Sequence, residues 1–216
     1  LDDAMFIPPV QHTIPDLMGD LEKFMHNDDI YLSELIRVAI MHYQFETIHP
    51  FLDGNGRVGR LLIPLYLVDK QILKQPILYI SDFFERNRQL YYDNLMKVRM
   101  NNDIKQWLKF FLVGIIETAN SGVKTFQAIL NLQKGVEEKI KNESKRSTSI
   151  LRLMDHLYRH PLIDAKRIVK ILDISPPTAY KILDEMEAMG ILQERTGAER
   201  GRLYMYAKYL NLFLNK

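Results

Sequence analysis

The hydrophobic positions of the first 70 residues predict three helices. A helix beginning around Pro15 and running to about His26 has its apolar residues on one face. The next begins near Ser33 and Glu34 and is almost continuously apolar, which is typical of a helix buried on several sides. It should end close to His49, because the residue before a proline is disfavoured in the helical region. A third helix is expected over 57–70, with a kink where Pro64 removes a backbone hydrogen bond.

The next 70 residues also predict helical structure, with one extended segment. Residues 74–80 are short, partly β-branched and extended in character. Ser81 or Asp82 can then cap a helix reaching about Val98. Asp103 followed by Gln106 is a capping-box pattern that opens another helix. We expect this helix to continue to about residue 140, with interruptions at its two glycines, Gly122 and Gly135.

The pattern changes after residue 140. Residues 141–149 are polar and lack hydrophobic periodicity, which predicts a linker. Three short helices are expected over 150–159, 165–172 and 177–189, with Ser175 and Gly190 flanking the last. Two short strands, 191–195 and 202–206, should follow. This order predicts a winged helix with a β-hairpin wing. The predicted organisation is mainly α, with a first domain at 1–142, a linker at 143–149 and a winged-helix domain at 150–216.

Composition excludes several classes of protein. The 216 residues are 47% hydrophobic and 26% charged and contain no cysteine, so disulfide scaffolds and thiol chemistry are excluded. No apolar run reaches membrane-spanning length and no export signal is visible, which favours a cytoplasmic protein without a membrane partner. The net charge is +2. Residues 1–146 carry 18 basic and 19 acidic side chains, and residues 147–216 carry 11 and 8. Neither part is basic enough to indicate nucleic-acid binding by charge alone.

The strongest chemical signal is the twelve-residue segment between the second and third helices, His-Pro-Phe-Leu-Asp-Gly-Asn-Gly-Arg-Val-Gly-Arg at 49–60. Its glycines, Gly54 and Gly56, can expose backbone N–H groups to an anion at a helix N-terminus. Arg57 and Arg60 are three residues apart and can face the same phosphate group. Asp53 offers a hard oxygen ligand for Mg²⁺. Histidine is the side chain best suited to accept a proton near neutral pH, which makes His49 the candidate base.

Two other residues of this segment have simpler expected roles. Phe51 is apolar and should anchor the loop to the core. Asn55 can either hold the loop or donate to a phosphate oxygen. A glycine-rich turn without function would explain two glycines, but it does not explain a base, a carboxylate and two arginines at matched spacing.

These residues resemble the signature of the Fic (Fic/Doc) family, His-Pro-Phe-x-[Asp/Asn]-Gly-Asn-Gly-Arg-x-x-Arg, at every defined position. The flanking residues 45–48 and 61–65, and the segment 84–92 downstream, are also similar to the family. The resemblance covers about residues 4–140. It implies transfer of AMP from ATP to a Ser, Thr or Tyr hydroxyl of a target protein, with release of pyrophosphate.

The resemblance also implies residue roles. His49 would be the catalytic base and Asp53 the Mg²⁺ ligand. The α- and β-phosphates would be held by Gly54, Asn55, Gly56 and Arg57, and Arg60 would meet the γ-phosphate. Tyr92 is similar in position to an adenine-contacting tyrosine, although a core tyrosine is an equal alternative. Residues 4–9 resemble the end of a flap that holds the target.

One feature of the family is missing from the sequence. Many members contain an inhibitory helix, [Ser/Thr]-x-x-x-Glu-[Gly/Asn], whose glutamate pairs with the second arginine. No such string occurs in these residues, so it lies upstream of Leu1 or is absent. As it stands, the sequence should be free of that inhibition.

Several alternatives accompany this interpretation. His42, Glu46 and His49 share a helix face, but a di-iron bundle site needs a second Glu-x-x-His, which the sequence lacks. Among enzymes, the alternative function is Fic-type transfer of another phosphate-containing group from a different donor. Among proteins that are not enzymes, the alternative is a DNA-binding regulator with a nucleotide-sensing site. A homodimer is a further partner that the sequence leaves open.

DNA contacts would come from the winged helix. Thr178, Tyr180 and Lys181 lie on its expected recognition helix, and the wing carries three arginines, Arg195, Arg200 and Arg202. Acidic residues on the same helix, Asp184, Glu185 and Glu187, argue against a phosphate backbone as its ligand.

Overall fold

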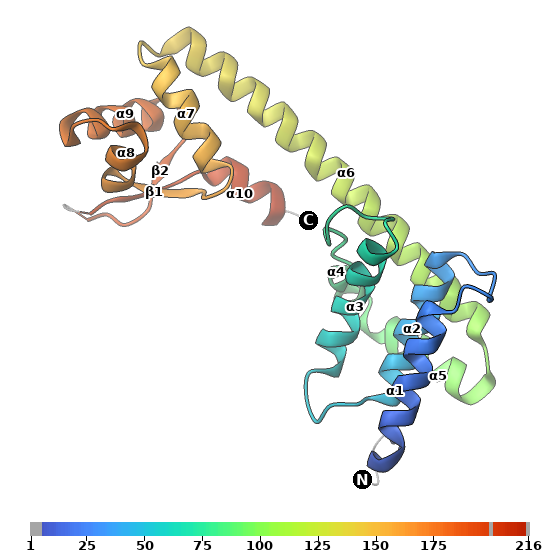
Figure 1. The fold of residues 1–216 in the computed structure, drawn as a ribbon. Coiled ribbons are helices and arrows are strands. Elements are labelled where there is room, and N and C mark those ends of the chain that lie inside the picture. Colours follow the sequence, from blue (N-terminus) through green and yellow to red (C-terminus); the bar gives the residue numbers. More distant parts are fainter. Residues whose placement is uncertain (1–5, 199–200, 215–216) are drawn as a thin grey trace. The chain divides into compact units, whose positions relative to one another are not determined.

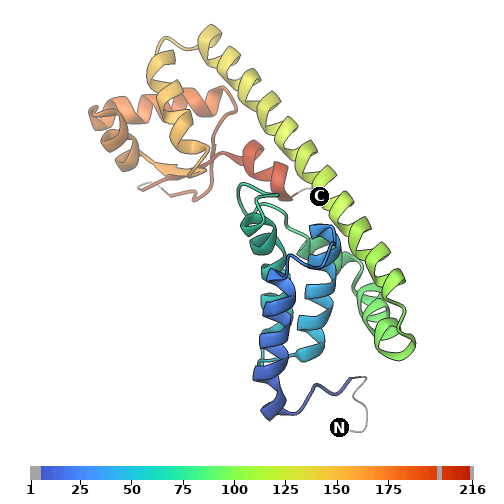
Figure 2. The same ribbon diagram turned by 45° about the vertical axis from the view of Figure 1, so that its right-hand side comes forward.

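The computed structural model describes residues 6–198 and 201–214. By its internal contacts the chain divides into two units, Leu1–Asn120 and Ser121–Lys216, each of which is traced in Figures 1 and 2. The division falls inside helix α6 (Ile104–Glu143), earlier than the expected boundary at residue 142. The reason is that Val136 and Ile140, late in α6, belong to the hydrophobic core of the C-terminal unit.

The N-terminal unit is helical. Helix α2 packs against both α1 and α3, and the buried core of the unit is centred on Phe45, Trp107 and Phe111. The elements that precede α6 are η1 (Gln11–Thr13), α1 (Ile14–His26), α2 (Glu34–Ile48), α3 (Asn55–Asp69), α4 (Ser81–Arg86) and α5 (Arg88–Asn101). The three helices predicted in the first 70 residues are therefore confirmed, and α3 runs through Pro64.

One expectation for this unit is wrong in detail. The helix predicted from Ser81 to Val98 is two helices, because the backbone leaves helical geometry at Asn87, whose side chain donates to the carbonyl of Phe83. Residues 74–80, expected to be extended in character, lie outside the helices and pair with no described strand. The cap at Asp103 is confirmed, as its carboxylate accepts from the Gln106 N–H at 3.1 Å.

Helix α6 is continuous, so the interruptions predicted at Gly122 and Gly135 are absent. Neither glycine has a positive φ, and a Cβ at either position would meet nothing within 4 Å. An isolated glycine costs a helix only about 1 kcal/mol relative to alanine. Neighbouring turns therefore carry the helix across both positions.

The C-terminal unit combines short helices with a small antiparallel sheet. Its elements after α6 are α7 (Ser147–Leu157), β1 (Leu162–Asp164), α8 (Ala165–Leu172), α9 (Pro176–Ala188), β2 (Gln193–Glu194), β3 (Leu203–Met205) and α10 (Ala207–Leu214). The sheet order is β1-β3-β2, and Ile163 lies opposite Tyr204. The three helices and the hairpin are confirmed. Strand β1 is not predicted, because three residues are too few to show a period. Helix α10 is also not predicted.

The connection between α6 and α7 is shorter than expected. Of the linker predicted at 143–149, residues 144–146 alone lie between the two helices. At the end of α9, Gly190 adopts a φ of +63°, as its predicted terminating role requires. Ser175 occupies the N-cap position of α9, but its hydroxyl contacts that of Thr178 and not the backbone.

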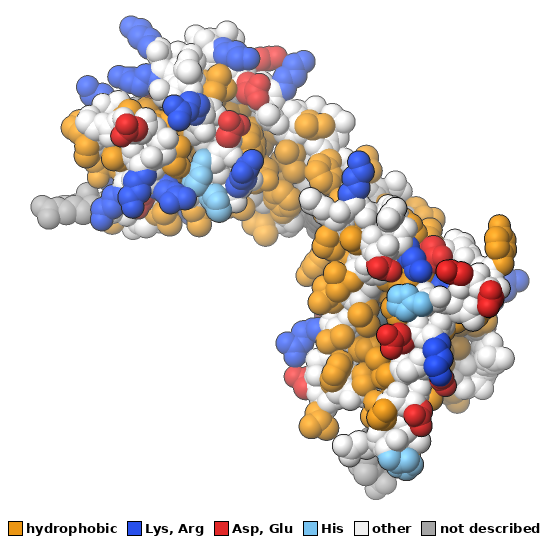
Figure 3. Space-filling model, in the orientation of Figure 1, with side chains coloured by type: hydrophobic (Ala, Val, Ile, Leu, Met, Phe, Trp, Pro, Cys, Tyr) orange, Lys and Arg blue, Asp and Glu red, His pale blue; other side chains and the backbone are white. Residues whose placement is uncertain are grey.

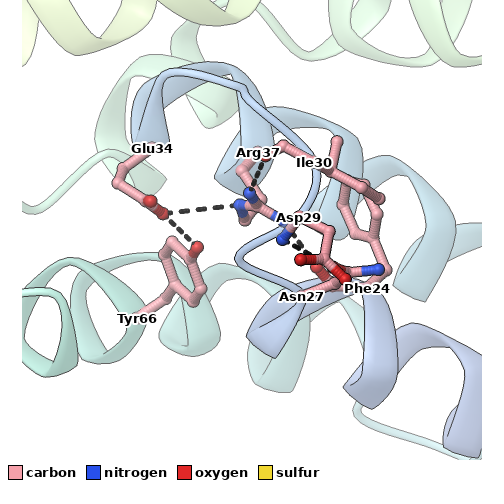
Figure 4. Close-up of polar contacts among 7 residues, drawn as sticks. All are labelled: Phe24, Asn27, Asp29, Ile30, Glu34, Arg37 and Tyr66. Atoms are coloured by element: carbon pink, nitrogen blue, oxygen red, sulfur yellow. Dashed lines mark hydrogen bonds and ion pairs between the residues drawn. The ribbon is translucent and has the colours of Figure 1, made fainter.

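A buried arginine ties α1, α2 and α3 together (Figure 4). Arg37, 3% exposed, donates to the carbonyls of Phe24 and Ile30, each at 2.7 Å. Its Nε lies 3.6 Å from the Glu34 carboxylate, which also accepts a hydrogen bond from Tyr66 of α3. This network fixes the α1–α2 connection onto the helix that precedes the His49 loop. Among the described helices, none is long and apolar enough to cross a membrane.

Candidate active site

The loop that follows α2 carries the residues singled out in the sequence. His49 ends α2 in the left-handed region, with φ +52°, and its N–H donates to the carbonyl of Phe45. Gly54, with φ +85°, precedes the first residue of α3. Both left-handed residues reverse the chain, because Pro50 prevents α2 from continuing and glycine accepts this φ without strain. The imidazole is therefore held at one end of the loop and the N-terminus of α3 at the other.

Asn55 closes the loop. Its side-chain oxygen accepts from the Phe51 N–H at 2.8 Å and its amide nitrogen donates to the Phe51 carbonyl at 2.6 Å. The residue is 2% exposed. Of the two roles left open for Asn55, the structure has its side chain holding the loop. The Phe51 ring lies 6.3 Å from that of Phe45 and remains half exposed, so it anchors the loop to the core in part.

The two glycines make room for the two arginines. A Cβ on Gly54 would lie 3.4 Å from Nη2 of Arg57, and one on Gly56 would lie 3.0 Å from Nη1 of Arg60. Each guanidinium therefore folds back over a glycine at the start of α3. Arg57 also pairs with Asp53 at 3.1 Å, and both side chains are mostly exposed. This part of the loop therefore presents the Arg57–Asp53 ion pair to solvent, beside the partly buried Arg60.

Three neighbouring hollows of the N-terminal unit meet these residues. One, of about 290 Å³, is lined by His49, Tyr92 and Arg99 among others. A second, of about 480 Å³, is lined by Arg57, Arg60 and Tyr79 among others. A third, of about 170 Å³, is lined by both Arg60 and Tyr92. Arg60 and Tyr92 thus connect the cavity beside His49 with the hollow beside the arginines.

Tyr92 and the residues near the N-terminus also reach the cavity beside His49. Tyr92 is 46% exposed and is not a core residue, whereas the adjacent Tyr91 is buried. Phe6 lines the same cavity, and the Arg99 guanidinium stacks 3.5 Å over its ring. Of the segment that resembles a flap, residues 4 and 5 lie outside the described residues.

His42 supports the loop from within α2, and both of its ring nitrogens contact protein groups. It is fully buried, with Nδ1 3.0 Å from the carbonyl of Gly59 and Nε2 3.0 Å from the hydroxyl of Tyr91. Because the carbonyl can only accept, Nδ1 donates and Nε2 accepts from the tyrosine. Within the described part of the chain, no group of three metal-binding side chains occurs. His42 therefore joins α2, the first turn of α3 and α5.

Glu46 is a site residue whose importance the sequence did not reveal. Its side chain lines the cavity beside His49 while being 8% exposed. Burial raises the pKa of this carboxyl, and the nearby charges of Arg60 and Arg99 oppose that rise. A Cβ on Gly59 would lie 2.4 Å from its Oε1, so glycine at that position leaves space for the acid. The signal that the sequence offered for this role was the position of Glu46, three residues before His49.

The buried His42 should make the N-terminal unit sensitive to acid. Burial lowers its pKa from 6.5 to about 4. The unfolded chain therefore binds this proton first as pH falls, and stability is lost between about pH 6.5 and 4. We expect a loss of about 2 kcal/mol from this group between pH 7 and 5. Urea unfolding followed by fluorescence of Trp107, the single tryptophan, measures this in the N-terminal unit.

His42→Gln is the comparison for this prediction. The amide can donate to Gly59 and accept from Tyr91 but does not titrate in this range. The unfolding free energy of the His42→Gln variant should change less between pH 7 and 5 than that of the unmodified chain. An equal pH dependence in both proteins would contradict the assignment to His42.

Comparison with known proteins agrees with this geometry. Residues 3–67 match the model of the Fic/DOC family. The chain is 39% identical over 70 residues to a probable protein adenylyltransferase of Aquifex aeolicus, covering 32% of this chain and 22% of that protein. It is 34% identical over 105 residues to the protein adenylyltransferase Fic of Culex quinquefasciatus, covering 48% and 20%. The chain thus spans about a fifth of the length of these relatives.

A solved structure resembles the chain over most of its length. The crystal structure of a Fic family protein from Desulfovibrio desulfuricans G20 superposes with a TM-score of 0.52 and 22% identity. The match covers 92% of this chain and 56% of that one, and it shows a shared fold. Together, the family match at 3–67 and the relatives show that the N-terminal part of the chain is similar to the Fic/DOC family, and the solved structure shows a shared fold.

Proposed function

We propose that the chain transfers AMP from ATP to a Ser, Thr or Tyr hydroxyl of a target protein. The observation that carries the proposal is the loop at 49–60, which joins a cavity-lining imidazole to a helix N-terminus bearing two arginines. Helix N-termini favour anions, and arginines pair with phosphate oxygens through two parallel donors. The names of the relatives, protein adenylyltransferases, agree with this chemistry.

The proposed step is an in-line displacement at the α-phosphorus. The target hydroxyl oxygen forms a bond to that phosphorus, the bond from the phosphorus to the bridging oxygen breaks, and pyrophosphate leaves. His49 accepts the hydroxyl proton. The backbone N–H groups at Gly54–Gly56 and the guanidinium of Arg57 hold the α- and β-phosphates, and Arg60 meets the γ-phosphate. Charge that develops at phosphorus is thus met by fixed donors.

The residues present fit a Mg²⁺ ion. Magnesium in nucleotide sites usually takes one or two carboxylates, keeps several waters and draws its remaining ligands from phosphates. Asp53 is an exposed carboxylate beside the phosphate cradle, by which we mean the N–H groups at Gly54–Gly56 with Arg57 and Arg60, and it can serve as such a ligand. Its ion pair with Arg57 must open before Asp53 binds the ion and Arg57 binds a phosphate. The ion, when bound, neutralises phosphate charge.

Labelled ATP tests the proposal. The chain is incubated with protein extract and with ATP carrying the label at either the α- or the γ-phosphate. Compared with extract alone, the added chain should increase protein-bound label from the α-position and not from the γ-position, because pyrophosphate leaves. An increase from the γ-position would indicate phosphoryl transfer by the chain. Nucleotide binding without any transfer would support a sensing role and overturn the proposal.

DNA binding by the C-terminal unit is a second candidate function. We propose a winged helix here, supported by the order α7-β1-α8-α9-β2-β3 and the antiparallel sheet. Two of the three acids on α9 that argue against DNA have internal partners. Glu185 pairs with Arg146 at 3.1 Å, and Glu187 accepts from the N–H of Glu194 at 3.2 Å. Figure 3 shows Lys and Arg side chains over the visible face of this unit.

The residues expected to contact DNA are available, as far as they are described. Tyr180, Lys181, Arg195 and Arg202 are exposed, while Arg200 lies outside the described residues. We expect a gel shift with duplex DNA that weakens as salt rises and is reduced several-fold by Lys181→Ala combined with Arg202→Ala. Lys139→Ala, which changes a lysine of α6 that pairs with Glu143, serves as control. The absence of a shift at low salt would exclude DNA binding as a function of this unit.

A homodimer and a cytoplasmic location stay predictions.

A further inference from the structure

The cavity beside His49 is an apolar space with few polar groups. Its apolar walls come from Phe6, Leu95 and Met96, and Tyr92 adds an exposed aromatic face. Flat heteroaromatic groups bind such spaces by stacking and burial. Because this cavity connects through Tyr92 and Arg60 to the arginine-lined hollow, it suits the base of a nucleotide whose phosphates occupy the cradle.

Most polar groups that line the cavity are already engaged. The Nη2 of Arg99 donates to the carbonyl of Glu46 at 3.2 Å and lies 3.5 Å from Oγ1 of Thr47, and Nη1 contacts the sulfur of Met96. Gln89 donates its amide N–H to Asp93 at 2.9 Å. The Nε of Arg99 has no hydrogen-bond partner among the described residues but is fully buried. Gln89 keeps a second amide N–H for other partners.

The carboxyl of Glu46 is different. Its Oε1 is buried against Gly59 and has no hydrogen-bond partner in the described residues. The side chain lines the cavity, and Oε2 is the oxygen left to meet a ligand there. No described group donates a hydrogen bond to Oε2 either, so a bound molecule that donates to this oxygen adds a hydrogen bond that the protein does not make by itself. An acceptor that faces an apolar cavity selects a ligand that carries a donor.

We propose that Glu46 is a specificity-determining residue that accepts a hydrogen bond from the exocyclic amino group of the nucleotide base, and so selects adenine over bases with a carbonyl at that position. This inference rests on the proposed nucleotide site and adds the residue that recognises the base. A base with a carbonyl at position 6, such as hypoxanthine, would place an acceptor against an acceptor. Sites built to bond a donor reject analogues that lack it, because the buried group stays unpaired.

The test compares nucleotides that differ at one group. Dissociation constants for the Mg²⁺ complexes of ATP, ITP and purine riboside triphosphate are measured by calorimetry with the full chain. ATP should bind about 10- to 100-fold more tightly than either analogue, the effect of one hydrogen bond to a charged group. Equal affinities for all three in the unmodified protein would overturn the inference, and this arm needs no variant to fold.

Variants then assign the selectivity to one side chain. In Glu46→Gln the amide can present either oxygen or N–H₂, so the ratio of ITP to ATP dissociation constants should fall toward 1. In Glu46→Met the ratio should also approach 1, with weaker binding of ATP. Glu22→Gln, which changes an exposed acid of α1 that lines none of the three hollows, should keep the ratio of the unmodified chain. Trp107 fluorescence verifies folding of each variant. A ratio unchanged in both Glu46 variants would overturn the role of Glu46.

The outcome is independent of the proposed transfer. A chain that discriminates ATP from ITP in this way but labels no protein would retain base recognition and lose the transferase function. A chain that labels protein yet binds ATP and ITP equally would keep the function and lose this inference.

Discussion

Replacing His49 with alanine should lower the rate of AMP transfer about 10²- to 10⁴-fold, the usual contribution of a positioned general base. The imidazole lines the cavity at the end of α2, and no described histidine other than His49 lines the three hollows around the loop. Its loss removes the proton acceptor without removing the phosphate cradle. Initial rates of label transfer from α-labelled ATP measure the effect, and calorimetry measures ATP affinity, which should change little.

A distant histidine provides the matched control. His12→Ala changes an exposed residue of η1 that lines none of these hollows and should leave the rate within about twofold. A second variant, His49→Asn, keeps a residue type that tolerates the left-handed backbone and should be as slow as His49→Ala. If the rate in His49→Ala stays within tenfold of the unmodified chain, His49 is not the base.

Replacing Arg37 with methionine should destabilise the N-terminal unit by about 3–5 kcal/mol, the cost of breaking a buried charged network by removing one partner. The guanidinium is 3% exposed and bonds two carbonyls as well as approaching Glu34. Methionine fills a similar length but donates nothing, so the carbonyls of Phe24 and Ile30 lose their side-chain donor (Figure 4). Urea unfolding followed by Trp107 fluorescence measures the loss.

Arg86→Met is the control for this prediction. Arg86 pairs with Asp82 one turn earlier at 3.1 Å, and both side chains are about half exposed. Exposed pairs of this kind contribute about 0–1 kcal/mol, so the unfolding midpoint should move little. Equal effects of the two substitutions would show that the buried network does not hold the α1–α2 connection.

The sequence predicted the helices on either side of the His49 loop, because both the hydrophobic period and the residues that begin and end helices are local features. His49 ends α2 beside a proline, and Gly54 precedes α3, so both boundaries were visible in the residues themselves. Strand β1 was not visible, since its partner β3 lies some forty residues later and three residues carry no period. Helix α6 was predicted in pieces because neighbouring turns outweigh the local cost of Gly122 and Gly135.

In the candidate site, too, some features follow from adjacent residues and others depend on packing. The sequence by itself determined the chemistry of residues 49–60, because a base, a carboxylate, two glycines and two arginines are adjacent along the chain. Only the tertiary structure decided which of these groups are free. It turned the side chain of Asn55 inward to close the loop, paired Asp53 with Arg57, and exposed Tyr92 while burying Tyr91.

Tertiary structure also brought in residues that the sequence did not mark. Glu46 and Arg99 lie more than fifty positions apart and line one cavity with His49. His42 bonds Gly59 and Tyr91, which join the loop helix to α5. Which polar groups find partners depends on packing between helices, and that packing is not encoded in any single segment. The residue types of the loop indicated its proposed chemistry by themselves, whereas the packing of helices decided that Glu46 lines the cavity beside His49 with no partner for its Oε1 in the described residues.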